Sequence, residues 1–191
     1  MIIESLVTTL DVGGTLNCAP MGVEWGDDVI VIKPFADTAT CRNLAATGVA
    51  VVNLTDDALL FAKAVAGHPD AVNPPTMAAA RVTGRVLKAA CTWREVEVTA
   101  SEVPSPRARF TTRVVHRGSQ REFLGFNRAR HAVLEAAILA TRTHLIPGAE
   151  IRAEFDRLRI IVEKTAGPDE RMAMKLLEDY VTPRLMETPA R

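Results

Sequence analysis

Two polar segments in the first 50 residues carry the side chains best suited to bind a ligand. The first, DTATCRNL at residues 37–44, sets two hydroxyls, a guanidinium and an amide around the predicted start of a helix: Thr38, Thr40, Arg42 and Asn43. Together with helix N-terminal amides, such groups suit a phosphate. An ordinary capped helix with one surface arginine is the alternative interpretation, and the residues alone leave both open.

The second polar segment is NCAPMGV at residues 17–23. Pro20 has no backbone N–H to donate, and Gly22 lets another group approach the backbone closely. A strand interrupted in this way leaves amide groups free, and these could face the polar edge of a flat ring. A bulged edge strand is the alternative.

Other catalytic centres find no support in the sequence. It contains no GxxxxGK[ST], GxGxxG, GxSxG or HExxH motif and no marked pair of carboxylates. Cys18, Cys41 and Cys91 are far apart and form no CxxC pair, and the four histidines lack metal-ligand spacing. We therefore expect reduced thiols, no metal and no Cys–His nucleophile.

Composition indicates a globular protein with one sizeable core. Of 191 residues, 48% are hydrophobic and 24% charged, no apolar run is long enough to span a bilayer, and no signal peptide precedes the first predicted strand. These features predict a cytoplasmic protein without membrane association. Residues 1–80 carry 3 Lys/Arg and 9 Asp/Glu, and residues 81–191 carry 20 and 14. Because the arginines alternate with acids, we expect ion pairs and solvated faces, and no nucleic-acid partner.

The first 125 residues are predicted to be mainly strands. Apolar or alternating runs at 2–12, 16–25, 29–35 and 49–55 predict strands, and two short helices, 37–48 and 57–66, end at glycines. Residues 67–78 are expected to form a loop. Two antiparallel strands with one wet face are expected within 81–117, joined by a corner at Pro104–Pro106.

The rest of the chain has helical periodicity. A helix at 128–145, capped by Asn127, is apolar nearly all round and is expected to be buried on more than one side. A second helix follows at 149–163, and a third begins at Pro168 and is expected to end at Pro183. Strands followed by helices predict an α+β class, with a domain at 1–125 and a helical segment at 126–191 packed on it.

NCAPMGV, TCRNL and the buried strand VAVVNL together resemble the flavin reductase-like group of FMN-binding split barrels. The tail, GFNRARHAVLEAAILATR followed by IVEKTAGPDERMAMKLL, is similar to one branch of that group, the family called domain of unknown function 447. The resemblance implies a six-stranded antiparallel Greek-key split barrel. It also implies a homodimer with FMN near the subunit interface, and it leaves the substrate unknown.

The resemblance also assigns roles to residues. It implies that six residues run beside the isoalloxazine ring, mainly through backbone groups: Asn17, Cys18, Ala19, Pro20, Met21 and Gly22. Thr40 and Asn43 match its T-x-x-N positions, near the phosphate or ribityl chain, and Asn53 is expected to reach the site. Thr38 and Arg42 are added from their chemistry, and the tail segment 126–128 is expected to close the pocket.

Two functions follow from this resemblance. The first is a flavin-dependent oxidoreductase, in which FMN does the redox chemistry and the protein binds and orients the ring. Its small-molecule partner is unknown, with NAD(P)H or a pterin as the candidates. The alternative is a non-catalytic flavin- or pterin-binding protein. Bleaching of the bound flavin by a hydride donor would separate them.

Overall fold

The computed structural model describes residues 1–103 and 106–187, which form two compact units. The barrel unit comprises Met1–Thr55 and Val72–Phe123, and the helical unit comprises Asp56–Ala71 and the chain from Leu124 onward. Residues 56–71 therefore belong with the C-terminal helices, whereas the sequence pattern predicts a domain at 1–125 that includes them. Of the predicted corner at Pro104–Pro106, residues 104 and 105 lie outside the described residues.

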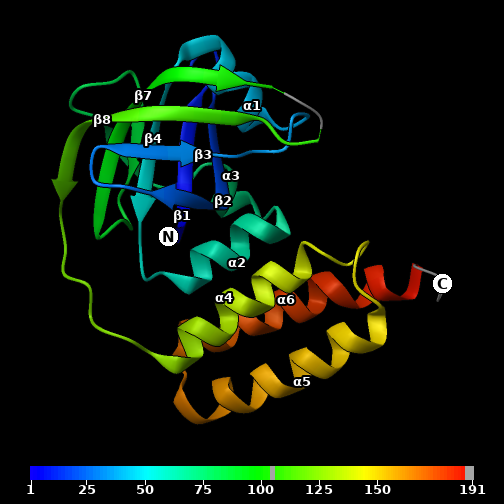
Figure 1. Cartoon of the computed structure of the whole chain (residues 1–191). Coiled ribbons are helices and arrows are strands. Elements are labelled where there is room, and N and C mark those ends of the chain that lie inside the picture. The colour runs from blue at the N-terminus through cyan, green and yellow to red at the C-terminus, as the bar shows by residue number, and fades with distance from the viewer. Residues whose placement is uncertain (104–105, 188–191) are drawn as a thin grey trace. The chain divides into compact units, whose positions relative to one another are not determined.

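Six antiparallel strands close the barrel of the first unit (Figure 1), in the order β1-β2-β3-β8-β7-β4. Their bounds are β1 Ile2–Leu10, β2 Leu16–Trp25, β3 Val29–Ile32, β4 Val49–Leu54, β7 Thr92–Glu102 and β8 Arg109–Ser119. Closure comes from β4, which pairs with β1 through Leu6↔Asn53, Val7↔Val52 and Thr8↔Val51. The predicted six-stranded split barrel is thus confirmed.

The barrel core consists of side chains from the inward faces of these strands. Val7, Ile30, Val52 and Phe110 are completely buried in it. Helix α1, Ala39–Thr47, adds Cys41 to the same cluster, so the helix is fixed against the barrel. Because β4 reads VAVVNL, successive residues supply both faces, as a strand buried on two sides requires.

A short two-stranded segment covers the outer face of β4 and β7. It contains β5, Thr76–Ala78, paired with β6, Arg85–Leu87. Its Val82 and Val86 form a second apolar cluster with Val51 and Trp93. Residues 67–78 are therefore not simply a loop, because they hold α3, Pro69–Val72, as well as β5. Such short elements depend on tertiary pairing and have no periodicity that a sequence pattern could reveal.

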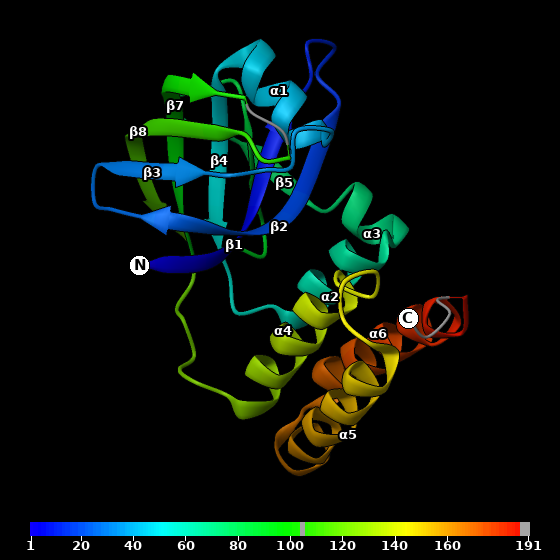
Figure 2. The ribbon, with the colours of Figure 1, turned by 45° about the vertical axis from the view of Figure 1, so that its right-hand side comes forward.

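Four longer helices make up the helical unit, and Figure 2 shows them from a second side. Their bounds are α2 Ala58–Ala66, α4 Arg128–Ala140, α5 Gly148–Thr165 and α6 Pro168–Glu187. Contacts with α2, α5 and α6 cover α4 on several sides, as its apolar composition predicted. This burial within one chain means that the composition of α4 does not require a second subunit. Among the described residues, no helix is both long and apolar enough to cross a membrane.

Two helix ends differ from the prediction. The helix expected at 128–145 ends at Ala140 and continues as turns. The third helix passes through Pro183 instead of ending there. Pro183 has no N–H to donate to the carbonyl of Asp179, so it removes one intrahelical hydrogen bond, and the helix ends four residues later at Glu187. Neighbouring side chains also bond carbonyls of this turn, Thr182 to Glu178 at 2.7 Å and Arg184 to Tyr180 at 2.7 Å.

Candidate functional site

The segment NCAPMGV lies in β2, which is continuous and carries an edge with little strand pairing. β2 pairs with β1 along its length, from Leu10↔Leu16 to Ile2↔Glu24. Its register with β3 includes only Glu24 and Trp25. Six half-buried residues of β2 therefore precede the paired end: Asn17, Cys18, Ala19, Pro20, Met21 and Gly22. Proline is compatible with such an edge because it lacks the N–H that would donate a hydrogen bond to a carbonyl of a neighbouring strand.

The segment DTATCRNL forms the start of α1, as predicted. Thr38 is the N-cap: its hydroxyl oxygen accepts from the N–H of Cys41 at 3.3 Å and donates to the carbonyl of Phe35 at 2.8 Å. Gly48 ends the helix with a φ of 70°. Arg42 is exposed, and its Nη1 donates to the carbonyl of Asp37 at 2.7 Å. The guanidinium thus lies beside the N-terminus of α1, where the helix dipole also favours an anion.

A cluster of four polar side chains connects β1, β2 and α1, and we call it the Thr9 cluster: Thr9, Asn17, Thr40 and Asn43. Nδ2 of Asn17 lies 2.9 Å from Oγ1 of Thr40 and 3.2 Å from Oγ1 of Thr9. Nδ2 of Asn43 lies 3.0 Å from the same Thr9 oxygen. Thr9, Thr40 and Asn43 are buried, and Asn17 is half-buried. Three residues predicted to bind FMN are therefore brought together.

Thr9 is the member of this cluster that sequence reasoning missed. It lies directly opposite Asn17 in the β1–β2 ladder. The hairpin register, read outward from the turn at Gly13-Gly14, could have identified it.

Asn53 lies apart from the other candidates. It is completely buried, and its Nδ2 donates to the carbonyl of Leu6 at 2.9 Å and to Oγ1 of Thr8 at 3.1 Å. Its Oδ1 accepts from the N–H of Leu87 at 2.9 Å. Thr8 and Thr9 are successive residues of β1 and point to opposite faces. The structure therefore does not bring Asn53 to the Thr9 cluster, and its amide instead connects β1, β4 and β6.

The cysteine of NCAPMGV, Cys18, is a neutral thiol. Cys18 is half-buried and pairs across the ladder with Thr8. Burial raises the pKa of the Cys18 thiol to about 12. At neutral pH the sulfur is therefore protonated, and a protonated thiol is a poor nucleophile.

The tail segment 126–128 belongs to the helical unit. Asn127 is the N-cap of α4, because its Oδ1 accepts from the N–H of Arg130 at 3.0 Å. Phe126 is exposed, with its ring centroid 5.7 Å from that of His131. The N-cap was predicted correctly, and closure of a pocket by this segment stays a prediction.

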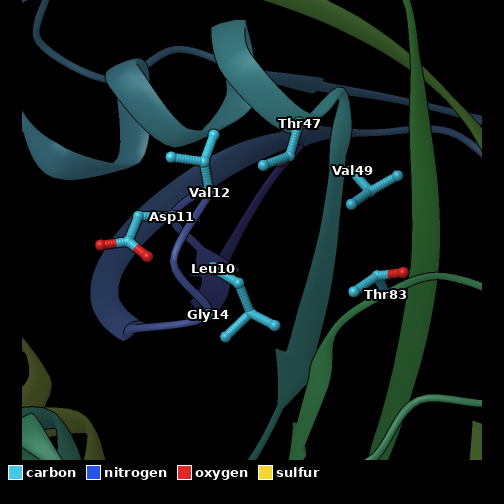
Figure 3. A pocket seen from close by; sticks show the side chains of 7 residues that line it. All are labelled: Leu10, Asp11, Val12, Gly14, Thr47, Val49 and Thr83. Atoms are coloured by element: carbon cyan, nitrogen blue, oxygen red, sulfur yellow. The ribbon is translucent and has the colours of Figure 1, made fainter.

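A cavity of about 330 Å³ lies beside the β1–β2 hairpin (Figure 3). Leu10, Thr47, Val49 and Thr83 point toward this hollow in the close-up view. Asp11, at its rim, accepts from the N–H groups of Gly13 and Thr15 at 2.9 and 2.8 Å, which fixes the turn. Hydrogen bonds from Thr15 lower the pKa of Asp11. The cavity contains none of the residues predicted to bind a cofactor.

Comparison with solved structures identifies the same fold in flavin proteins. An FMN-bound protein from Methanosarcina mazei, assigned to the DUF447 family, is 23% identical over 94% of both chains, with a TM-score of 0.81. Flavoredoxin from Methanosarcina acetivorans is 15% identical, covering 65% of this chain and 72% of its own, with a TM-score of 0.55. An FMN-binding protein from Thermus thermophilus is 13% identical, covering 62% and 71%, with a TM-score of 0.52. These likenesses show the split-barrel fold of the flavin reductase-like group.

Family models cover most of the chain. The N-terminal domain model of the protein of unknown function DUF447 matches residues 3–121, and the C-terminal model matches residues 127–179. The boundary between the two models falls close to the boundary between Phe123 and Leu124. The chain therefore belongs to the DUF447 family, and it has the split-barrel fold of the flavin reductases.

Proposed function

We propose that this protein binds FMN in its barrel unit and is a flavin-dependent oxidoreductase. The observation that carries the proposal is the Thr9 cluster, because it joins residues from two separate flavin-type motifs: Asn17 and Asn43 both donate to the Thr9 hydroxyl, and Asn17 also donates to Thr40. The FMN-bound family member from Methanosarcina mazei supports the identity of the ligand. Bound FMN would supply hydride and electron transfer, and the protein's own part is to bind and orient it.

The residues present fit the chemical groups of FMN. The edge of β2 offers backbone groups and Ala19, Pro20 and Gly22, whose small or fixed shapes suit a flat ring. The first turn of α1 contains no acidic residue, so no carboxylate within that turn competes with a bound anion for the positive end of the helix dipole. We therefore assign the phosphate to the α1 start, with Thr38 and Arg42, and the ribityl chain to the Thr9 cluster.

The substrate is a small molecule that stacks on the exposed face of the flavin, and NAD(P)H and a reduced pterin are the two candidates. A flavin- or pterin-binding protein without turnover is the alternative. A stopped-flow mixture of the FMN-loaded protein with NADH, NADPH or tetrahydropterin separates these functions. Rapid bleaching of the flavin band supports the oxidoreductase, and no bleaching by any donor supports the binding protein.

We also propose a homodimer. Three exposed apolar side chains, close together in the sequence, support it: Phe123, Leu124 and Phe126. A second chain that covered them would remove apolar surface from water. Sedimentation velocity, recorded at both the protein and the flavin bands, measures the mass and shows whether the flavin travels with it. A monomer at all concentrations would contradict this part of the proposal.

FMN binding itself is tested with purified protein. The protein is stripped of small molecules and titrated with FMN and with riboflavin by isothermal calorimetry. We expect saturable binding of FMN and weaker binding of riboflavin, since riboflavin lacks the phosphate. Absence of heat or fluorescence quenching with FMN would overturn the proposed function.

Replacing Arg42 with alanine should weaken FMN binding by about 1.5–3 kcal/mol, the range for a hydrogen bond to a charged group. Thr40→Ala should cost less, because the neutral hydroxyl contributes a weaker hydrogen bond. Calorimetric titration measures both affinities, and Arg85→Ala, which removes an exposed arginine on β6, is the control. Wild-type affinity in both variants would contradict the assignment of residues 37–44 to the phosphate.

Cys18→Ser should retain both FMN and any reductase activity. The thiol is protonated at neutral pH, since burial raises its pKa to about 12, so it is not a redox partner of the flavin. Flavin titration and single-turnover reduction of the variant check this result. Intact binding with lost turnover would instead indicate a flavin–thiol couple.

A further inference from the structure

We propose that Thr9 is a positioning residue that holds Asn17 and Asn43 in the orientation needed to bind FMN. The inference rests on the proposed function and concerns a residue outside both flavin-type motifs. Thr9 is 2% exposed and lies within β1, so its hydroxyl is fixed by the barrel ladder itself. Its role is to act through the two asparagines.

The Thr9 hydroxyl is shared by two amide donors. Nδ2 of Asn17, from β2, and Nδ2 of Asn43, from α1, lie 3.2 and 3.0 Å from Oγ1 of Thr9. A hydroxyl oxygen has two lone pairs, so these two donors use its acceptor capacity. One oxygen atom of β1 thereby sets the position of α1 relative to β2.

The orientation of the Asn17 amide is set at both hydrogens. One is donated to Thr9 and the other to Oγ1 of Thr40, at 2.9 Å. The Oδ1 atom therefore points away from the Thr9 cluster. Across residues 1–103 and 106–187, the hydrogen bonds recorded for Asn17 and Asn43 side chains all use Nδ2. Both Oδ1 atoms are thus left as acceptors for a ligand.

FMN presents donors that match these two acceptors. The isoalloxazine ring carries one N–H group, and the ribityl chain carries several hydroxyls. Thr9→Val keeps the shape of the side chain and removes the oxygen. The two amides then lose their shared acceptor at a site screened from water, which drives them to turn toward other partners. Their Oδ1 atoms turn with them and no longer meet the flavin.

The experiment compares Thr9→Val with Thr9→Ser, which restores the hydroxyl, and with Thr112→Val as a matched control. Thr112 is a completely buried threonine of β8 whose hydroxyl donates to the carbonyl of Ile30 at 2.7 Å. β8 pairs with β3 and β7, away from β1. FMN Kd is measured by quenching of flavin fluorescence, below the thermal midpoint of every variant. Visible circular dichroism is recorded at saturating FMN.

We expect Thr9→Val to raise the FMN Kd at least tenfold and to change the visible dichroism of the bound flavin. Thr9→Ser should stay within about threefold of the wild type, and Thr112→Val should lower the thermal midpoint without changing Kd or dichroism. Should Thr9→Val not fold, Thr9→Ala removes the same acceptor with less side-chain volume and takes its place.

Two results would overturn the inference while FMN binding stands. One is wild-type Kd and dichroism in Thr9→Val or Thr9→Ala. The other is failure of Thr9→Ser to restore binding, which would indicate a role in packing alone. A wild-type protein that binds no FMN would overturn the proposed function, and the inference with it.

Discussion

Arg130→Ala should lower the free energy of unfolding by about 3 kcal/mol, because it leaves two carboxylates without their shared cation. Nη1 of Arg130 lies 2.7 Å from Oδ2 of Asp56, and its Nε lies 3.0 Å from Oε1 of Glu170. The side chains of Asp56 and Glu170 are 4% and 11% exposed, so water reaches them poorly. Urea denaturation of both proteins measures the difference.

Arg157→Ala is the matched control for this prediction. Arg157 also forms an ion pair in the helical unit, with Glu154 at 3.3 Å, but its side chain is 75% exposed. Exposed pairs of this kind contribute little, so the change should stay within about 0.5 kcal/mol. Equal losses in the two variants would contradict the view that burial of the carboxylates causes the effect of Arg130→Ala.

The effect of Arg130→Ala should also depend on pH. Burial by itself would raise the pKa of Glu170, but hydrogen bonds from Arg130 and from the N–H of Gly167 lower it below its ordinary value. The stabilisation from this group is therefore present above the unfolded pKa of about 4.3 and is lost as the pH falls through the folded pKa. The difference between wild type and variant should shrink toward acid pH.

Glu95→Ala should lower the free energy of unfolding by roughly 3 kcal/mol or more, because four donors, two of them buried, lose the carboxylate that accepts from them. Glu95 is completely buried in β7. Its carboxylate accepts from the N–H groups of Ala80, Arg81 and Val82 at 2.8, 2.6 and 3.1 Å. It also accepts from the indole N–H of Trp93 at 3.2 Å. Thermal and urea unfolding, with Trp fluorescence as the probe, check this prediction.

Glu97→Ala provides the comparison for Glu95→Ala. Glu97 lies two residues further along the strand, half-buried, and pairs with Arg113 at 3.0 Å. Its loss should cost less than about 1 kcal/mol.

The contribution of Glu95 should also depend on pH. Burial would raise the pKa of Glu95, and the hydrogen bonds from Ala80, Arg81 and Trp93 outweigh it, so the pKa lies below its ordinary value. Its contribution is therefore lost as the pH falls below about 4.3 through the folded pKa. If Glu95→Ala were as stable as the wild type near neutral pH, the stabilising role assigned to the Glu95 carboxylate would be refuted.

Short-range patterns were sufficient to locate most elements. Gly48 ends α1, Gly67 ends α2 and Asn127 caps α4, all as predicted. Caps and left-handed glycines satisfy the backbone groups of their own helix end, so the sequence around them is enough to find them. The family motifs likewise lie within single elements, and they identified the split barrel correctly.

Only the tertiary structure decided which of these residues meet. The alternating pattern of β7 predicted a solvent-exposed face. This was wrong for Glu95, because the N–H groups of residues 80–82 donate to its carboxylate and cover it. The pairing of β4 with β1 brings Asn53 to Thr8, whereas the packing of α1 against the barrel brings Asn43 to Thr9. Register between strands and the cover provided by distant loops depend on contacts far apart in sequence, and no local pattern encodes them.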